Sequence, residues 1–187
     1  QYNVLGPVGM ETQDQFHEAG TAKEQAVLAI LLMERGRAVS TQTLADRLWD
    51  EQPPEKFRET LQVYVSRLRR RLREAGHQDA VITSSRAGYR IDVPAELVDV
   101  HRFDLLVSQA QTRTGADPHS ARNLFRQAEA LWKGEPLAGV AGSWADTIRR
   151  ILSDKRRTAL LRRIELDLRT GGSADDAVAE LTALASG

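Results

Sequence analysis

Residues 55–76 constrain the fold more than any other part of this chain, because they combine an apolar stripe with a dense run of arginines. The apolar residues recur at steps of four, three and four, the spacing of one helical face; they are Leu61, Val65, Leu68 and Leu72. Residues 67–73 contain five arginines and no acidic residue. An α-helix puts these two sets on opposite sides. We therefore expect a helix over residues 55–76 with an apolar inner face and a basic outer face.

Two shorter helices are expected before this one. Thr21 and Glu24 have the spacing of a capping box and precede an apolar run, which predicts a helix over residues 21–34. A second, short helix is expected over residues 40–49, and the two prolines at 53–54 break the chain after it.

A β-hairpin is expected after the basic helix. Its strands would be the runs at 81–83 and 89–93, and the turn between them carries Arg86. Residues 2–19 alternate weakly in polarity and predict short antiparallel strands. A short helix, a tight turn, a basic helix and a hairpin make up a winged helix-turn-helix, in which the basic helix enters the major groove of DNA and the hairpin reaches the next minor groove or the backbone.

The chain reads as helix throughout its second half. The apolar spacing and capping residues predict four helices, over residues 101–113, 118–132, 143–170 and 174–185. Antiparallel helix pairs would bury their apolar stripes, including Ile151 and Leu168 of the third of these helices. Trp132 and Trp144 are expected in the core.

The fold class that these elements predict is mainly α with small β-sheets. Pro94 marks a linker, so we divide the chain into a winged-helix domain over residues 1–95 and an all-α domain over residues 99–187.

The charge of the chain is balanced overall but not locally. The 26 basic and 26 acidic residues give a net charge of zero. Residues 55–90 hold nine basic and four acidic residues, so this stretch carries +5 and the remainder carries −5. A bound polyanion responds to the local field, so the chain can offer an anion-binding face despite its neutral total.

Several functional classes are disfavoured by composition. The absence of cysteine excludes disulfides, thiolate zinc sites and cysteine nucleophiles. The longest apolar run has eight residues, whereas a membrane span needs about 20. The four histidines are scattered without ligand spacing, and residues 20–23 lack most of a phosphate-binding loop. We expect neither an enzyme nor a metal or cofactor site, and we expect a cytoplasmic protein.

The outer face of the basic helix supplies the candidate DNA contacts. Arg67 and Arg70 face outward in this prediction and can bond guanine edges or phosphates. If either side chain turned into the protein or paired with an acid, the interpretation as a DNA-binding regulator would fail. Val63 would meet a thymine methyl group. The short polar residues Thr60, Gln62 and Ser66 are suited to bases or phosphates. Arg69 and Arg73, on the flanks of the helix, are suited to phosphates, and Arg86 is the candidate in the hairpin.

Other interpretations of the same residues stay open. The arginine-rich side can be a solvated helix face, since arginine is a good helix former. Arg71 can pair with an acid inside the domain instead of facing DNA. Tyr64 lies near the edge of the apolar stripe and is expected to be partly in the core. The whole unit can also be a helical interaction module whose winged helix docks protein, although protein interfaces prefer aromatic anchors.

Blocks along nearly the whole chain resemble the Streptomyces antibiotic regulatory protein (SARP) family. They occur in the same order and at the same spacing as in that family. The blocks are Leu5-Gly6-Pro7-Val8, residues 23–32, residues 39–49, residues 53–54, residues 60–72, Ala87-Gly88-Tyr89-Arg90, Asp99-Val100-His101-Arg102-Phe103 and residues 131–137.

This resemblance implies an OmpR-type winged helix followed by a bacterial transcriptional activation domain of tetratricopeptide-like helix pairs. Family members bind direct repeats near the −35 element as head-to-tail pairs. The resemblance thus implies a homodimer on double-stranded DNA that recruits RNA polymerase holoenzyme, including its sigma factor, to antibiotic genes.

Carried onto this sequence, the resemblance gives contact positions in the helix and in the hairpin. In the helix they are Thr60, Gln62, Tyr64, Ser66, Arg67, Arg69 and Arg70, and in the hairpin either Arg86 or Arg90 enters a groove. The hairpin tip has Arg86-Ala87-Gly88 where the family more often has proline and glycine, so this choice stays open. About 89 residues follow Val98, fewer than in the family's activation domain, and we expect a truncated chain.

Overall fold

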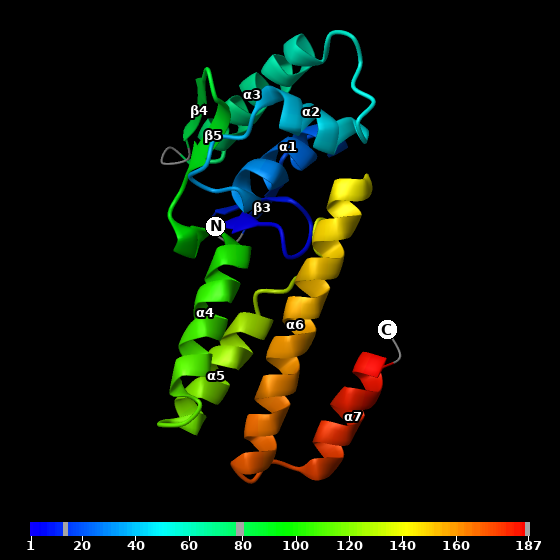
Figure 1. The fold of residues 1–187 in the computed structure, drawn as a ribbon. Helices are drawn as coiled ribbons and strands as arrows, with labels where there is room; N and C mark the ends of the chain where they lie inside the picture. Colours follow the sequence, from blue (N-terminus) through cyan, green and yellow to red (C-terminus); the bar gives the residue numbers. More distant parts are fainter. Residues whose placement is uncertain (13–14, 78–80, 186–187) are drawn as a thin grey trace.

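The computed structural model describes residues 1–12, 15–77 and 81–185, which form two lobes (Figure 1). The N-terminal lobe contains β1 (Tyr2–Asn3), β2 (Gly9–Thr12), β3 (Gln15–Glu18), α1 (Ala22–Met33), α2 (Thr41–Trp49), α3 (Phe57–Glu74), β4 (Val81–Ser85) and β5 (Gly88–Asp92). The second lobe contains α4 (Asp99–Arg113), α5 (Pro118–Glu129), α6 (Ser143–Arg169) and α7 (Ala174–Ala185). A 3₁₀ turn, η1 (Ala95–Leu97), joins them. The predicted fold class, mainly helical with small antiparallel sheets, is confirmed.

Two of the three helices of the N-terminal lobe begin at side-chain caps. Thr21 and Glu24 form both hydrogen bonds of a capping box at α1, and Ser40 accepts from the Thr43 N–H at α2. The long helix α3 begins at Phe57 rather than at residue 55, because residues 54–57 form a turn closed by the bond from Phe57 N to Pro54 O. Such a turn carries the chain from the proline pair into the helix.

The hairpin β4–β5 is fastened to the helical body close to its turn. Its strands pair antiparallel from Val81↔Asp92 to Ser85↔Gly88, and Tyr89 forms a bridge with Val39 ahead of α2. Gly88 has φ +121°, and a Cβ there would lie 1.9 Å from the Val39 carbonyl oxygen. Only glycine therefore lets the hairpin lie this close to the chain before α2.

The second lobe corrects two predictions. The helix expected over residues 118–132 ends at Glu129, and Trp132 lies in the following turn, buried edge-on against Phe103 at 5.4 Å between ring centroids. Ile151 and Leu168 were expected inside but are exposed. Helix α6 contacts α2, α5 and α7, so its buried side changes along its 27 residues and no single stripe describes it.

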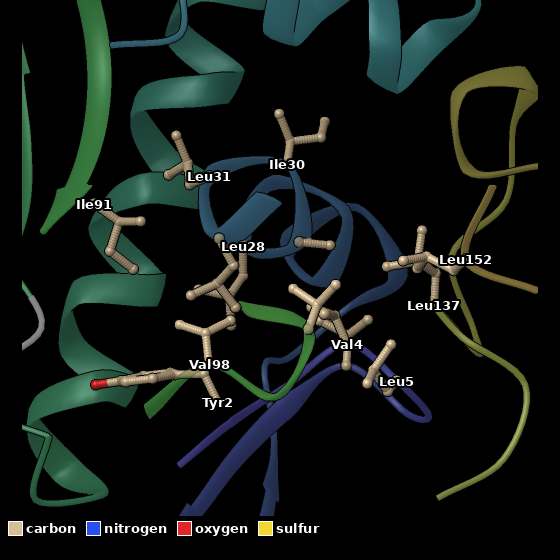
Figure 2. Packing of buried hydrophobic residues seen from close by; sticks show 14 of the residues in the cluster. Tyr2, Val4, Leu5, Leu28, Ile30, Leu31, Ile91, Val98, Leu137 and Leu152 are labelled. Atoms are coloured by element: carbon tan, nitrogen blue, oxygen red, sulfur yellow. The ribbon is translucent and has the colours of Figure 1, made fainter. Parts of the chain in front are cut away.

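The two lobes share one hydrophobic core. Figure 2 shows Tyr2, Val4 and Leu5 of the N-terminal segment packed among Val98, Leu137 and Leu152 of the second lobe and residues of α1. The backbone N–H groups of Lys133, Leu137 and Ala138 donate to the carbonyls of residues 4–6. The division at residues 95–99 stays a prediction, because packing continues across it.

Two carboxylates reinforce this junction. Asp99 is buried and accepts hydrogen bonds from the N–H groups of Val4, Leu5 and Val100 at 2.7–3.0 Å. Burial raises the pKa of Asp99 to about 6, against the lowering effect of those N–H donors. Asp50, at the end of α2, accepts from the Ser143 N–H and hydroxyl at the start of α6, and these bonds lower the pKa of its carboxyl group.

Candidate nucleic-acid interface

Helix α3 has a fully buried inner face and a polar outer face. Leu61, Val65, Leu68 and Leu72 are buried, as their spacing predicted. On the outer face, Val63 is 46% exposed and the Arg70 side chain is 62% exposed. Gln62, Ser66 and Arg73 are exposed on the same side. An outward valine among arginines has no partner in the hydrophobic core, so this surface can offer both apolar and cationic contacts.

The side of α3 that faces α1 is organised around one buried acid. The Glu24 side chain is 1% exposed, and its Oε1 lies 3.3 Å from Nη1 of Arg67. Its Oε2 accepts from the Thr21 N–H at 2.9 Å and lies 3.9 Å from Nε of Arg71. Arg67 is still 50% exposed, so the contact holds one nitrogen of its guanidinium and leaves the rest at the surface.

The opposite side of α3 meets the hairpin. Arg69 donates from Nε to the Ile82 carbonyl of β4 at 2.8 Å, which ties the helix to the first strand of the hairpin. A polar cleft of about 430 Å³ opens between α3, the start of α2 and the hairpin. It is lined by Thr41, Gln62, Val65, Arg69, Ser84, Ser85, Gly88 and Tyr89.

Two further candidates lie partly inside the protein. Tyr64 is half-buried against the core, as its position beside the apolar stripe predicted. Thr60 is also half-buried, and its hydroxyl donates to the Lys56 carbonyl at 3.1 Å. A threonine hydroxyl keeps its acceptor lone pairs when it donates, so Thr60 can still accept one bond.

The hairpin presents its two arginines differently. Arg86 lies in the exposed turn between β4 and β5. Arg90 is exposed on β5, and its guanidinium pairs with Asp92 at 2.7 Å and 2.9 Å. Arg86 is therefore at the tip, while Arg90 is partly neutralised two residues from an acid.

Four of the five arginines at 67–73 have partners, and of these pairs only Arg70–Glu74 has a spacing that the local sequence reveals. Arg67 and Arg71 share Glu24, Arg69 bonds a carbonyl, and Arg70 lies 3.8 Å from Glu74 in an exposed pair. The sequence left open whether Arg71 faces DNA or pairs with an acid inside the domain, and in the structure it lies beside the buried acid Glu24. The expectation that Arg67 and Arg70 face outward without an acidic partner is wrong for both, because Glu24 approaches Arg67 from another helix and Glu74 lies one turn from Arg70. Both side chains are nevertheless at least half exposed, so neither is turned into the protein.

Sequence reasoning missed part of this surface. Thr41, Ser84 and Ser85 line the cleft beside α3 but were not among the candidates. The start of α2 had a signal in the Ser40 cap, whereas the two serines of the hairpin had none.

Within residues 1–12, 15–77 and 81–185 no cluster of His, Asp or Glu could hold a metal ion. In this same part of the chain no helix has the length and apolarity needed to cross a membrane.

Two family models match the chain, one on each lobe. The model "Transcriptional regulatory protein, C terminal" matches residues 17–91, and the model "Bacterial transcriptional activator domain" matches residues 98–186. A winged helix-turn-helix with this outer face, followed by such a helical domain, defines a transcriptional regulator of the OmpR type.

Relatives identify the family. Regulatory protein AfsR of Streptomyces coelicolor is 38% identical over 98% of this chain and 18% of its own length. Regulatory protein DnrI of Streptomyces peucetius is 34% identical over 98% of this chain and 70% of its own length. The chain belongs to the Streptomyces antibiotic regulatory protein family.

A solved structure has the same fold. Mycobacterium tuberculosis EmbR, in a complex with a low-affinity phosphopeptide, superimposes with a TM-score of 0.89 at 29% sequence identity. The match covers 97% of this chain and 48% of EmbR. The chain also spans 18% of the length of AfsR from both Streptomyces coelicolor and Streptomyces griseus.

Proposed function

We propose that this chain binds duplex DNA in a sequence-specific manner and activates transcription. Helix α3 would lie in the major groove and the β4–β5 hairpin would reach the neighbouring minor groove. The observation that carries the proposal is the outer face of α3, where exposed Val63 and Arg70 stand beside half-exposed Arg67. Apolar and bidentate cationic groups side by side are what thymine and guanine edges require.

The proposed contacts divide by chemistry. Arg67, Arg70 and Val63 would read base edges, and Gln62 and Ser66 would bond bases or phosphates. Arg73 and the free nitrogens of Arg69 would contact phosphates, as would the Thr60 and Tyr64 hydroxyls where they reach the surface. Arg86 would enter the minor groove, because it is at the tip and Arg90 is paired with Asp92; Arg90 would contact the backbone.

The larger assembly is proposed from family membership. The target would be direct repeats near a −35 element, bound by two copies head to tail. The helical lobe would then contact RNA polymerase holoenzyme, including its sigma factor, at promoters of an antibiotic gene cluster. The work would take place in the cytoplasm at the nucleoid, with no enzymatic step.

A mobility-shift titration across a salt series tests DNA binding. If about six phosphates are neutralised, the logarithm of the association constant falls with log salt at a slope of about −5. A duplex selected by the protein from random DNA should bind more tightly than a shuffled duplex of the same composition. A flat salt response with no selected sequence would instead favour the protein-docking module.

A further inference from the structure

Glu24 is a buried acid that contacts the DNA-facing side of the molecule only through other side chains. It lies in the first turn of α1, and its carboxylate is held by the Thr21 N–H at 2.9 Å. Burying a carboxylate is costly unless it is paired, and its charge partners here are Arg67 and Arg71 of α3. The capping bond from the Thr21 N–H therefore holds the Glu24 carboxylate in place independently of Arg67 and Arg71.

The chain leaves room for this contact beside α1. Gly20 has φ +98°, and a Cβ there would lie 2.1 Å from Oε2 of Glu24 and 2.8 Å from Nε of Arg71. A side chain at this position would therefore displace the carboxylate or the guanidinium. The Glu24 carboxylate and the Arg71 guanidinium need the space that this glycine leaves open.

Glu24 gives Arg67 an orientation that Arg70 lacks. Nη1 of Arg67 lies 3.3 Å from a rigid, buried carboxylate, whereas Arg70 has only Glu74, whose side chain is 67% exposed. A guanidinium is planar, so holding one nitrogen restricts the directions in which the remaining donors can point. A side chain ordered before binding loses less conformational freedom when it meets its target.

We propose that Glu24 is a positioning residue for DNA recognition: it holds Arg67, with Arg71 behind it, in the orientation that discriminates between base sequences. This inference rests on the proposed DNA-binding function. It assigns to a residue of α1 an effect on specificity rather than on general affinity. Arg67 makes the contact, and Glu24 acts through it.

Two substitutions of Glu24 separate geometry from charge. Glu24→Gln keeps the length and can still serve the helix cap, but removes the charge. Glu24→Asp keeps the charge, but shortens the side chain and withdraws it from Arg67. Glu34→Gln is the matched control, because it removes one charge at the other end of α1, where Glu34 pairs with Arg47 at 3.0 Å.

The measurement is the ratio of affinities for two duplexes at one fixed salt concentration. One duplex is selected by the wild-type chain from random DNA, and the other is a shuffled duplex of the same composition. We expect both Glu24 variants to lower this ratio about fivefold to tenfold, and Glu34→Gln to leave it unchanged. In an Arg67→Ala background, Glu24→Gln should lower the ratio no further.

Other outcomes overturn the inference. If Glu24→Gln strengthens binding to both duplexes equally and Glu24→Asp matches wild type, Glu24 acts only by its charge. If both variants weaken both duplexes equally and lower the melting temperature, its role is structural. Should Glu24→Gln not fold, the result with Glu24→Asp decides. A wild-type chain that selects no duplex overturns the proposed function itself, whereas an unchanged ratio in the variants overturns only the role of Glu24.

Discussion

At the residue scale, helix geometry determines which side chains of α3 face outward. The period of a helix follows from backbone geometry, so the sequence alone placed Val63 and Arg70 opposite Leu68. The contact between Arg67 and Glu24 joins residues 43 positions apart. It depends on how α1 crosses α3, and no local pattern encodes that crossing.

Replacing Arg67 with alanine tests whether it reads a base. If it does, Arg67→Ala weakens the selected duplex by about 1–3 kcal/mol and leaves the shuffled duplex much less affected. Competition binding at one salt concentration measures the affinity for the selected duplex and the affinity for the shuffled duplex. Arg157→Ala, an exposed arginine of α6, is the control and should change neither affinity. Equal losses on both duplexes would make Arg67 a phosphate contact.

At the element scale, capped and amphipathic helices were predicted well, and the longest helix was not. Helices α1, α2 and α5 begin at the caps that the sequence shows, because a cap is a local hydrogen bond. Helix α6 packs against three different helices along its length, so its exposed and buried positions do not follow one period. The hairpin was expected, but the fit of Gly88 against Val39 depends on tertiary contact.

The inner face of α3 makes a stability prediction. Leu68 is fully buried, so Leu68→Ala should lower the free energy of unfolding by about 2–5 kcal/mol through lost burial and the cavity left behind. Urea denaturation measures the change. Leu105→Ala removes the same atoms from an exposed position of α4 and should cost far less. Equal effects of the two substitutions would contradict the facing of α3.

At the scale of the whole molecule, the two lobes are joined more closely than a division of the sequence implies. Pro94 and the change to continuous helix suggested a linker, and η1 lies there. The sequence did not reveal that residues 4–6 pair with the chain around residues 133–138, because those backbone bonds involve no distinctive side chain. Buried Asp99 belongs to this same junction.

The pH dependence of stability tests the junction. The pKa of Asp99 is about 6 in the fold against an ordinary value of 3.8, so the folded state binds more protons between these values. Its contribution to stability is therefore greatest below pH 4 and falls by about 3 kcal/mol as pH rises through 6. Urea unfolding of wild type and Asp99→Asn at pH 4–7 isolates this contribution as a difference. The free energy of unfolding of wild type minus that of Asp99→Asn should fall as pH rises from 4 to 7. The same quantity for Asp92→Asn, an exposed control, should not change in this way. A value for Asp99→Asn that rises with pH would refute the assignment.

The Asp99 junction has a consequence for any shortened form of the protein. A polypeptide ending after residue 95 would keep every side chain proposed to touch DNA. It would nevertheless lose Asp99, which accepts hydrogen bonds from the N–H groups of Val4 and Leu5. It would also lose the backbone N–H groups of residues 133–138 that bond to the carbonyls of residues 4–6. The N-terminal lobe therefore depends on the helical lobe for these backbone partners, and we expect the shortened polypeptide to unfold at a lower urea concentration than the whole chain.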